Sequence, residues 1–158
     1  MTYILMAIFA ALILVLDQVS KFLTVANIPL YQSVDFIPGV LSLTYVQNDG
    51  AAFSMLEGQQ WLFAIVFALF AVFIVWEFSK KRLPLKAFER WCIVAVFDCG
   101  LGNMIDRLRL GYVVDMIKTE FMDFPVFNVA DCFITCGCIL LIAHLIFFNK
   151  EFWKDEKK

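Results

Sequence analysis

The chain has 158 residues, of which 62% are hydrophobic and 16% aromatic, and its mean hydropathy is +0.80. Soluble domains are about 45–50% apolar, so this composition excludes an ordinary soluble protein and indicates a single membrane domain. The net charge is −2 and the basic residues lie beside apolar segments, which argues against a nucleic-acid-binding protein.

Four apolar segments have the length of membrane spans and lie at about residues 3–24, 61–78, 89–107 and 129–148. About 20 residues cross the hydrocarbon core of a bilayer. The third segment contains Asp98, Asn103 and Asp106; we include it because an odd number of spans would separate the two most basic segments. The first lacks a basic start and a cleavage site, so we predict a retained span and not a cleaved signal peptide. The expected fold class is an all-α membrane protein with four transmembrane helices.

Positive charge is concentrated in two places that four spans would put on one side of the membrane. The residues are Lys80, Lys81, Arg82, Lys86 and Arg90, between the second and third spans, and Lys150, Lys154, Lys157 and Lys158, after the fourth. Cytoplasmic loops carry an excess of Lys and Arg, so both termini are expected in the cytoplasm. Residues 25–60 and 108–128 then face outward.

The first outward segment, at about residues 30–53, is expected to form a small sheet on the membrane surface, which we call the β-cradle. Leu41 to Tyr45 alternates apolar and polar residues with the period of a half-buried strand. Ile37-Pro38-Gly39 fits a type II turn, so residues 32–36 can pair back as a hairpin. In the second outward segment, Gly111 is a turn residue and residues 112–114 favour β structure.

Polar residues gather at the predicted outward ends of all four spans. They are Asp17, Lys21, Asn48, Asp49, Asn103, Asp106, Arg107, Asp115, Asn128 and Asp131. A charge in the middle of a span costs about 2.5–3.5 kcal/mol, and a helix end needs only one or two anchors, so the convergence predicts a functional site. Simpler interpretations exist for single residues. They are an i,i+4 ion pair of Asp17 with Lys21, helix capping by Asn128 and Asp131, and interfacial anchoring by Asp106 and Arg107.

Asp115 and Asp131 are candidates for acid–base chemistry, and their separation of 16 residues allows the chain to bring them together. Two neighbouring carboxylates share a proton. The ionised one can take a proton from water as the water attacks a carbonyl, and the protonated one can donate to the carbonyl oxygen. This chemistry needs no metal and no cofactor. The five cysteines (Cys92, Cys99, Cys132, Cys136, Cys138) and His144 lack metal-ligand spacing and are expected to be packing residues.

Five motifs in order resemble those of one family. They are D-Q-x-x-K at 17–21, NDGAAF at 48–53, GNMIDR at 102–107, GYVVD at 111–115 and FNVAD at 127–131. The set resembles the bacterial lipoprotein signal peptidases (signal peptidase II). The resemblance implies an aspartic endopeptidase of the bacterial (inner) cell membrane that cleaves prolipoproteins before a cysteine carrying a diacylglyceryl group. It also implies four transmembrane helices, an outer β-cradle, and inhibition by globomycin-type cyclic peptides.

The resemblance assigns roles by position in this sequence. Asp115 and Asp131 match the catalytic dyad. Positions that support the dyad or contact substrate are matched by Asn48, Gly50, Asn103, Arg107, Asn128 and Ala130. Asp17 and Lys21 match a pair whose role is structural or catalytic, and Asp106 is a supporting residue. The chain departs from the family at Asp98-Cys99, where two small residues are usual; an acid there should be uncharged, paired or hydrated.

For the mechanism, we expect the signal helix of the substrate to enter from the bilayer with its acyl chains in lipid or in an apolar groove. The β-cradle would bind the extended residues around the scissile bond by strand addition. Asp131, near a helix N-terminus, is the expected base, and Asp115 is the expected protonated partner. Two other classes remain open. One is a small transporter with a polar path along Asp17, Lys21, Asp98 and Asp106, and the other is a non-enzymatic assembly protein whose aspartates serve packing.

Overall fold

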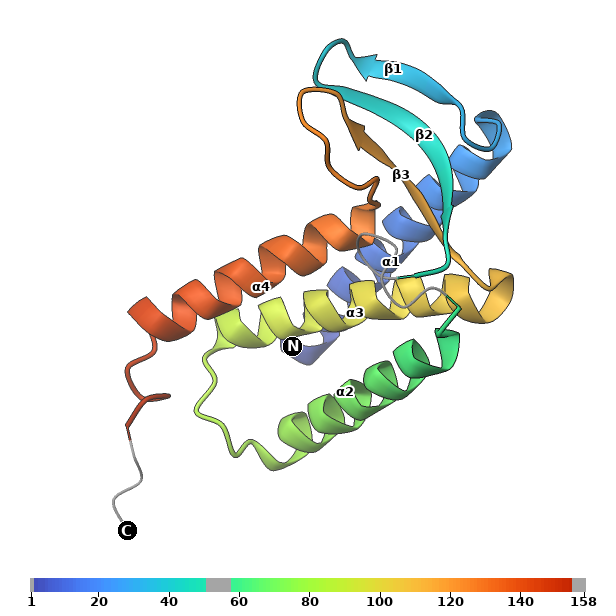
Figure 1. The fold of residues 1–158 in the computed structure, drawn as a ribbon. Coiled ribbons are helices and arrows are strands. Elements are labelled where there is room, and N and C mark those ends of the chain that lie inside the picture. The colour runs from blue at the N-terminus through green and yellow to red at the C-terminus, as the bar shows by residue number, and fades with distance from the viewer. Residues whose placement is uncertain (1, 51–57, 155–158) are drawn as a thin grey trace.

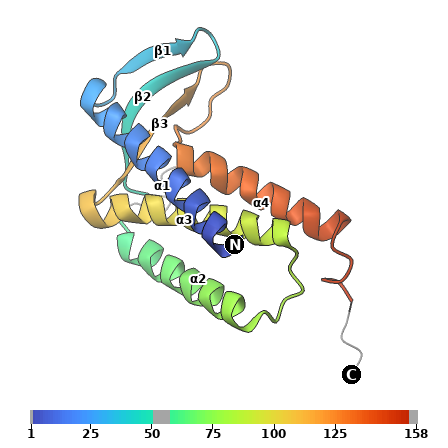
Figure 2. The same cartoon turned by 180° about the vertical axis from the view of Figure 1, so that it is seen from behind.

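The computed structural model describes residues 2–50 and 58–154 and contains four helices and three strands in these parts of the chain (Figure 1). In chain order they are α1 (Thr2–Asn27), β1 (Ser33–Ile37), β2 (Leu41–Asn48), α2 (Gln60–Lys80), α3 (Ala87–Leu110), β3 (Val113–Thr119) and α4 (Val129–Phe147). The helices form a bundle, and the sheet projects from one end of it. The start of α1, the α2–α3 connection and the residues after α4 lie at the other end in both views (Figures 1 and 2).

All four predicted spans are helices, with bounds within three residues of those expected. Three of them, α1, α2 and α4, are long and apolar enough to cross a membrane. Helix α3 has 24 residues and is therefore about 36 Å long, but it is too polar to meet the same criterion.

The position of α3 explains its composition. It packs against α1, α2 and α4, so its polar residues meet protein and not lipid. Its buried residues include Glu89, Asp98, Asn103 and Asp106, whereas the other three helices expose many large apolar side chains. A central helix can hold polar groups because its neighbours satisfy them.

The sheet has the order β1-β2-β3 and is antiparallel throughout. The predicted hairpin is confirmed: Gly39 has φ 74° and Val40 N–H donates to the Ile37 carbonyl at 2.9 Å, as a type II turn requires. The third strand was not assigned to the β-cradle from the sequence, although strand-forming residues were noted at 112–114. It pairs with β2 so that Asp115 lies opposite Val46. The expected cradle residues 51–53 lie outside the described residues.

A polar cluster ties α3 to α4 at the end away from the sheet. Glu89 is fully buried, and its carboxylate contacts His144 Nδ1 at 2.8 Å and accepts from Asn149 Nδ2 at 2.7 Å and from Lys86 N–H at 2.6 Å. His144 also packs between the rings of Phe88 and Phe148. The expectation that His144 only packs was therefore incomplete, because it is also the polar partner of a buried acid.

Candidate active site

The two candidate aspartates come from different elements that meet where the bundle joins the sheet. Asp115 lies in β3, on a strand whose first four residues are buried. Asp131 is the third residue of α4, and Asn128 caps that helix: its side-chain oxygen accepts from Asp131 N–H at 3.0 Å, and its own N–H donates to Asp131 Oδ2 at 3.1 Å. This is a capping box, which fixes the Asp131 carboxylate at the helix N-terminus.

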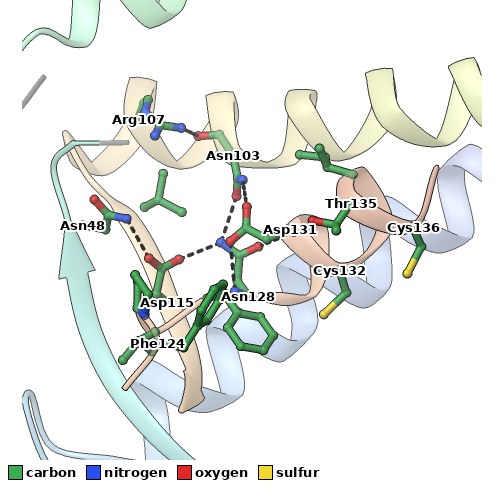
Figure 3. A pocket seen from close by; sticks show the side chains of 15 residues that line it. Asn48, Asn103, Arg107, Asp115, Phe124, Asn128, Asp131, Cys132, Thr135 and Cys136 are labelled. Atoms are coloured by element: carbon green, nitrogen blue, oxygen red, sulfur yellow. Dashed lines mark hydrogen bonds between the residues drawn. The ribbon is translucent and has the colours of Figure 1, made fainter. Parts of the chain in front are cut away.

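Asn128 also joins the two aspartates (Figure 3). Its Nδ2 donates to Asp115 Oδ1 at 2.7 Å and to Asn103 Oδ1 at 3.2 Å, and its side chain is fully buried. The simpler interpretation of Asn128 as a cap is correct but insufficient, since one residue caps α4 and contacts both carboxylates.

Two further asparagines complete the hydrogen bonding of the aspartates. Asn48, at the end of β2, donates to Asp115 Oδ2 at 2.8 Å, and Asn103, on α3, donates to Asp131 Oδ1 at 3.1 Å. Each of the four carboxylate oxygens thus accepts a hydrogen bond. The donors are amides and a main-chain N–H, which orient the carboxylates without adding charge.

Beneath this pair lies a buried ion cluster. Lys21 Nζ is 2.8 Å from Asp17 Oδ2 and 2.9 Å from Asp106 Oδ2, and it donates to Asn103 Oδ1 at 2.7 Å. All three charged side chains are at most 4% exposed. The expected i,i+4 pair of Asp17 with Lys21 is present, but the interpretation as a helix-end pair alone is incomplete, because Lys21 also pairs with Asp106. Asp106 is buried within the protein and is not an interfacial anchor.

Arg107 holds the chain that follows β2. Its NH2 group donates to the Gly50 carbonyl at 2.9 Å, and its guanidinium carbon lies 4.4 Å from the centre of the Phe63 ring. Gly50 N–H in turn donates to Asn48 Oδ1 at 3.0 Å, so this contact also orients the amide that binds Asp115. The remaining residues of that motif, 51–53, lie outside the described part of the chain.

A cavity of about 480 Å³ opens beside the two aspartates, and both line it together with Asn48, Asn103, Arg107 and Asn128. Its other walls are mostly apolar and come from residues 124–127 and from α4, including Ile134. Cys132 and Cys136 also line the cavity (Figure 3), so for these two the expectation of simple packing was wrong. Their spacing of one and five residues after Asp131 was the available signal.

Burial sets the protonation of Asp115. It raises the pKa of this carboxyl from 3.8 to about 6, while the hydrogen bonds from Asn48 and Asn128 act in the opposite direction. The negative charge of Asp131 adds to the rise, and the positive charge of Lys21 opposes it. Asp115 is therefore harder to ionise than an ordinary aspartate, as expected of the protonated member of a carboxyl pair.

Two polar residues near the site had no partner or role assigned from the sequence. Gln18, which lies in the first motif, donates to Asp17 Oδ2 at 3.2 Å and to Asp106 Oδ1 at 3.1 Å. Asp98 is buried below this layer, and its Oδ2 has no hydrogen-bond partner within residues 2–50 and 58–154. Nothing in the structure explains why an acid occupies that position.

Comparisons with known proteins show the family to which the chain is similar. The family model described as signal peptidase (SPase) II matches residues 9–147. A lipoprotein signal peptidase of Streptococcus pyogenes serotype M2 (strain MGAS10270) is 44% identical over 145 residues, which cover 92% of this chain and 90% of the relative. Its counterpart from serotype M5 (strain Manfredo) is 43% identical over the same shares.

Two solved structures described as bacterial membrane enzymes have the same fold. One superposes with a TM-score of 0.84 at 33% identity and covers 97% of this chain and 93% of its own. The other has a TM-score of 0.80 at 33% identity and covers 90% and 93%. The helix bundle and the appended sheet thus define the fold of a bacterial membrane enzyme, and the matching family is one of aspartic peptidases.

The chain belongs to the signal peptidase II family, the lipoprotein signal peptidases, which cleave signal peptides from lipoprotein precursors. This membership decides against the transporter and assembly-protein alternatives.

Proposed function

We propose that Asp115 and Asp131 are the catalytic dyad with which this peptidase hydrolyses the peptide bond of its substrate. The observation that carries the proposal is their joint attachment to Asn128 at the wall of a cavity of about 480 Å³. Two carboxyls that both contact Asn128, beside a cavity with mostly apolar walls, have the arrangement that acid–base catalysis by two carboxyls requires.

The reaction proceeds in two proton-coupled steps. Ionised Asp131 removes a proton from a water molecule as its oxygen attacks the scissile carbonyl carbon, while protonated Asp115 donates its proton to the carbonyl oxygen. In the second step the tetrahedral intermediate returns its hydroxyl proton to Asp115 as the C=O bond re-forms. Asp131 gives its proton to the leaving nitrogen, and the C–N bond breaks.

The assignment of Asp131 as base rests on two features. Asp131 accepts a hydrogen bond from the Asn128 N–H at the first turn of α4, where the helix dipole favours a negative charge. The raised pKa of Asp115, about 6, favours the proton on that residue. A neutron structure with the proton on Asp131 would reverse the two roles.

The proposed substrate is a diacylglyceryl-modified prolipoprotein, cleaved just before the lipidated cysteine. The mostly apolar cavity walls suit the apolar part of such a substrate. Arg107 lines the same cavity and places a positive charge beside the two aspartates. Globomycin-type cyclic peptides are expected to compete for this cavity.

We further propose that α3 is the fourth membrane span and that the sheet lies on the outer surface of the bacterial cell membrane. The support is the position of the basic α2–α3 connection. It lies at the end of the bundle away from the sheet, as do the start of α1 and the residues after α4 (Figures 1 and 2). By the positive-inside rule that end is cytoplasmic, so the dyad lies at the extracytoplasmic face and lipids surround the bundle.

Cleavage of a purified diacylglyceryl-modified prolipoprotein tests the dyad. The released signal peptide is followed by mass for wild type, Asp115→Asn and Asp131→Asn, with the folded fraction of each measured in detergent. Glu151→Gln, at an exposed acid after α4, is the matched control. We expect both dyad variants to lose cleavage by at least about a thousandfold while the control cleaves normally. Cleavage by a folded Asp115→Asn or Asp131→Asn protein would refute the proposal.

A further inference from the structure

The buried ion cluster is connected to the main chain at two informative points. Asp17 Oδ1 accepts the N–H of Ala130 at 3.2 Å, and Asp106 Oδ2 accepts the N–H of Val114 at 3.3 Å. Ala130 and Val114 are the residues immediately before Asp131 and Asp115. The main-chain N–H of the residue before each dyad aspartate therefore donates a hydrogen bond to one acid of the ion cluster.

Lys21 links these two anchors. Its ammonium lies 2.8 Å from Asp17 and 2.9 Å from Asp106, and the Gln18 amide spans the same two acids at 3.2 and 3.1 Å. An unbroken path of polar contacts thus runs from the Ala130 N–H to the Val114 N–H. Buried charges held in this way are costly to displace, since moving one leaves its partner buried and unpaired.

We infer that Asp17, Lys21 and Asp106 act as a positioning unit that sets the separation and orientation of the dyad aspartates through the main chain. Asp17 fixes the first turn of α4, which carries Asp131, and Asp106 fixes β3, which carries Asp115. The inference rests on the proposed role of the dyad and assigns a function to residues that would otherwise be only structural.

Two observations separate positioning from substrate contact and from simple packing. None of the three side chains lines the cavity, so the cluster acts on the reaction only through other residues. The two anchored residues are also held by apolar packing on opposite sides: Ala130 lies in a core cluster with Ile13 and Cys99, and Val114 lies in another with Tyr45. The ion cluster therefore links two packing units through the main chain.

The hydrogen bond between the Val114 N–H and Asp106 can be tested by two substitutions of Asp106. Asp106→Asn keeps an oxygen that accepts from the Val114 N–H, whereas Asp106→Ala removes it. We expect Asp106→Ala to lower kcat about tenfold to a hundredfold, as misplacement of a catalytic group does, with KM within about twofold of wild type. Asp106→Asn should retain several times more kcat than Asp106→Ala. Equal loss in the two folded variants, or a change in KM alone, would overturn the inference.

The pH profile provides a readout that a merely structural role would not change. The charges that face Asp115 are Asp131 on α4, Lys21 on α1 and Arg107 on α3. Since the charge of Lys21 lowers the pKa of Asp115, Lys21→Met should move the basic limb of the kcat profile to higher pH. Lys21→Arg, which keeps the charge, should restore its position.

Lys118→Met is the matched control, because the Lys118 side chain is 43% exposed and pairs only with Glu120 among the described residues. It removes the same charge from the sheet side of the molecule and should leave kcat and its pH profile unchanged. A folded Lys21→Met protein with the wild-type profile would contradict the inference. If Lys21→Met keeps the wild-type profile while Asp115→Asn loses cleavage, the proposed dyad stands and only the positioning unit is rejected.

Discussion

The raised pKa of Asp115 predicts that this residue destabilises the folded protein at neutral pH. Burial is the main cause of the rise from 3.8 to about 6, and one pKa unit is worth about 1.4 kcal/mol. The difference of about 2.2 between the two values therefore corresponds to about 3 kcal/mol. The folded protein holds this proton to higher pH than the unfolded chain does. The free energy of unfolding consequently falls as the pH rises from about 4 to about 6 and is level above that window.

The substitution that isolates this contribution is Asp115→Asn, because asparagine resembles the protonated acid and does not titrate. Equilibrium unfolding of both proteins in mixed detergent micelles, at a series of pH values from about 3 to about 7.5, measures it. We expect the wild type to lose about 3 kcal/mol relative to the variant across this range. Asn48 and Asn128 each donate to a different oxygen of Asp115, and the amide of the variant has only one oxygen. This loss lowers the free energy of unfolding of the variant by about 1–3 kcal/mol at every pH.

The pH dependence of the difference, and not its size at one pH, is therefore the test. Parallel curves for the two proteins would show that Asp115 ionises as easily in the fold as in the unfolded chain. A difference that changes in the opposite direction would mean that its hydrogen bonds outweigh burial. Either result would remove the physical basis for assigning the proton to Asp115.

Two further predictions concern the surroundings of the dyad. A Cβ at Gly102 would lie 2.6 Å from Asp17 Oδ2, so Gly102→Ala should displace Asp17, cost about 1–3 kcal/mol in the free energy of unfolding and lower kcat. Unchanged stability and cleavage would contradict this close approach of α1 and α3. Cys136 is an exposed free thiol at the cavity wall, so a bulky maleimide should slow cleavage and substrate should protect against labelling. Cys136→Ser should cleave normally with the reagent present; equal inhibition of that variant would place the effect elsewhere.

The features that were predictable from the sequence are those set by local chemistry. Apolar length located the four helices, and Pro38-Gly39 located the hairpin between β1 and β2. The motif residues at the span ends were expected to converge, and the structure brings Asp115, Asp131 and their three asparagines together. These inferences need only the periodicity, length and turn preferences of short segments.

The features that were missed depend on contacts between distant parts of the chain. Strand β3 pairs with β2 across a sequence separation of about 70 residues, and no local pattern specifies that partner. The same holds for His144 and Glu89, which are 55 residues apart. Asn128 was recognisable as a cap from its position before α4, but its bond to Asp115 follows only from the way β3 and α4 pack.

The low hydropathy of α3 follows from the same packing. Hydropathy measures how well a helix tolerates lipid, whereas α3 contacts α1, α2 and α4. It carries Asn103, which donates to Asp131, and Asp106, which belongs to the ion cluster. A hydrolytic site among apolar helices needs ordered polar groups that lipid cannot provide. The helix with the most protein neighbours is where such groups cost least, because each can be hydrogen-bonded. The helix with the lowest hydropathy is therefore the one whose polar residues connect the proposed active site to the rest of the bundle.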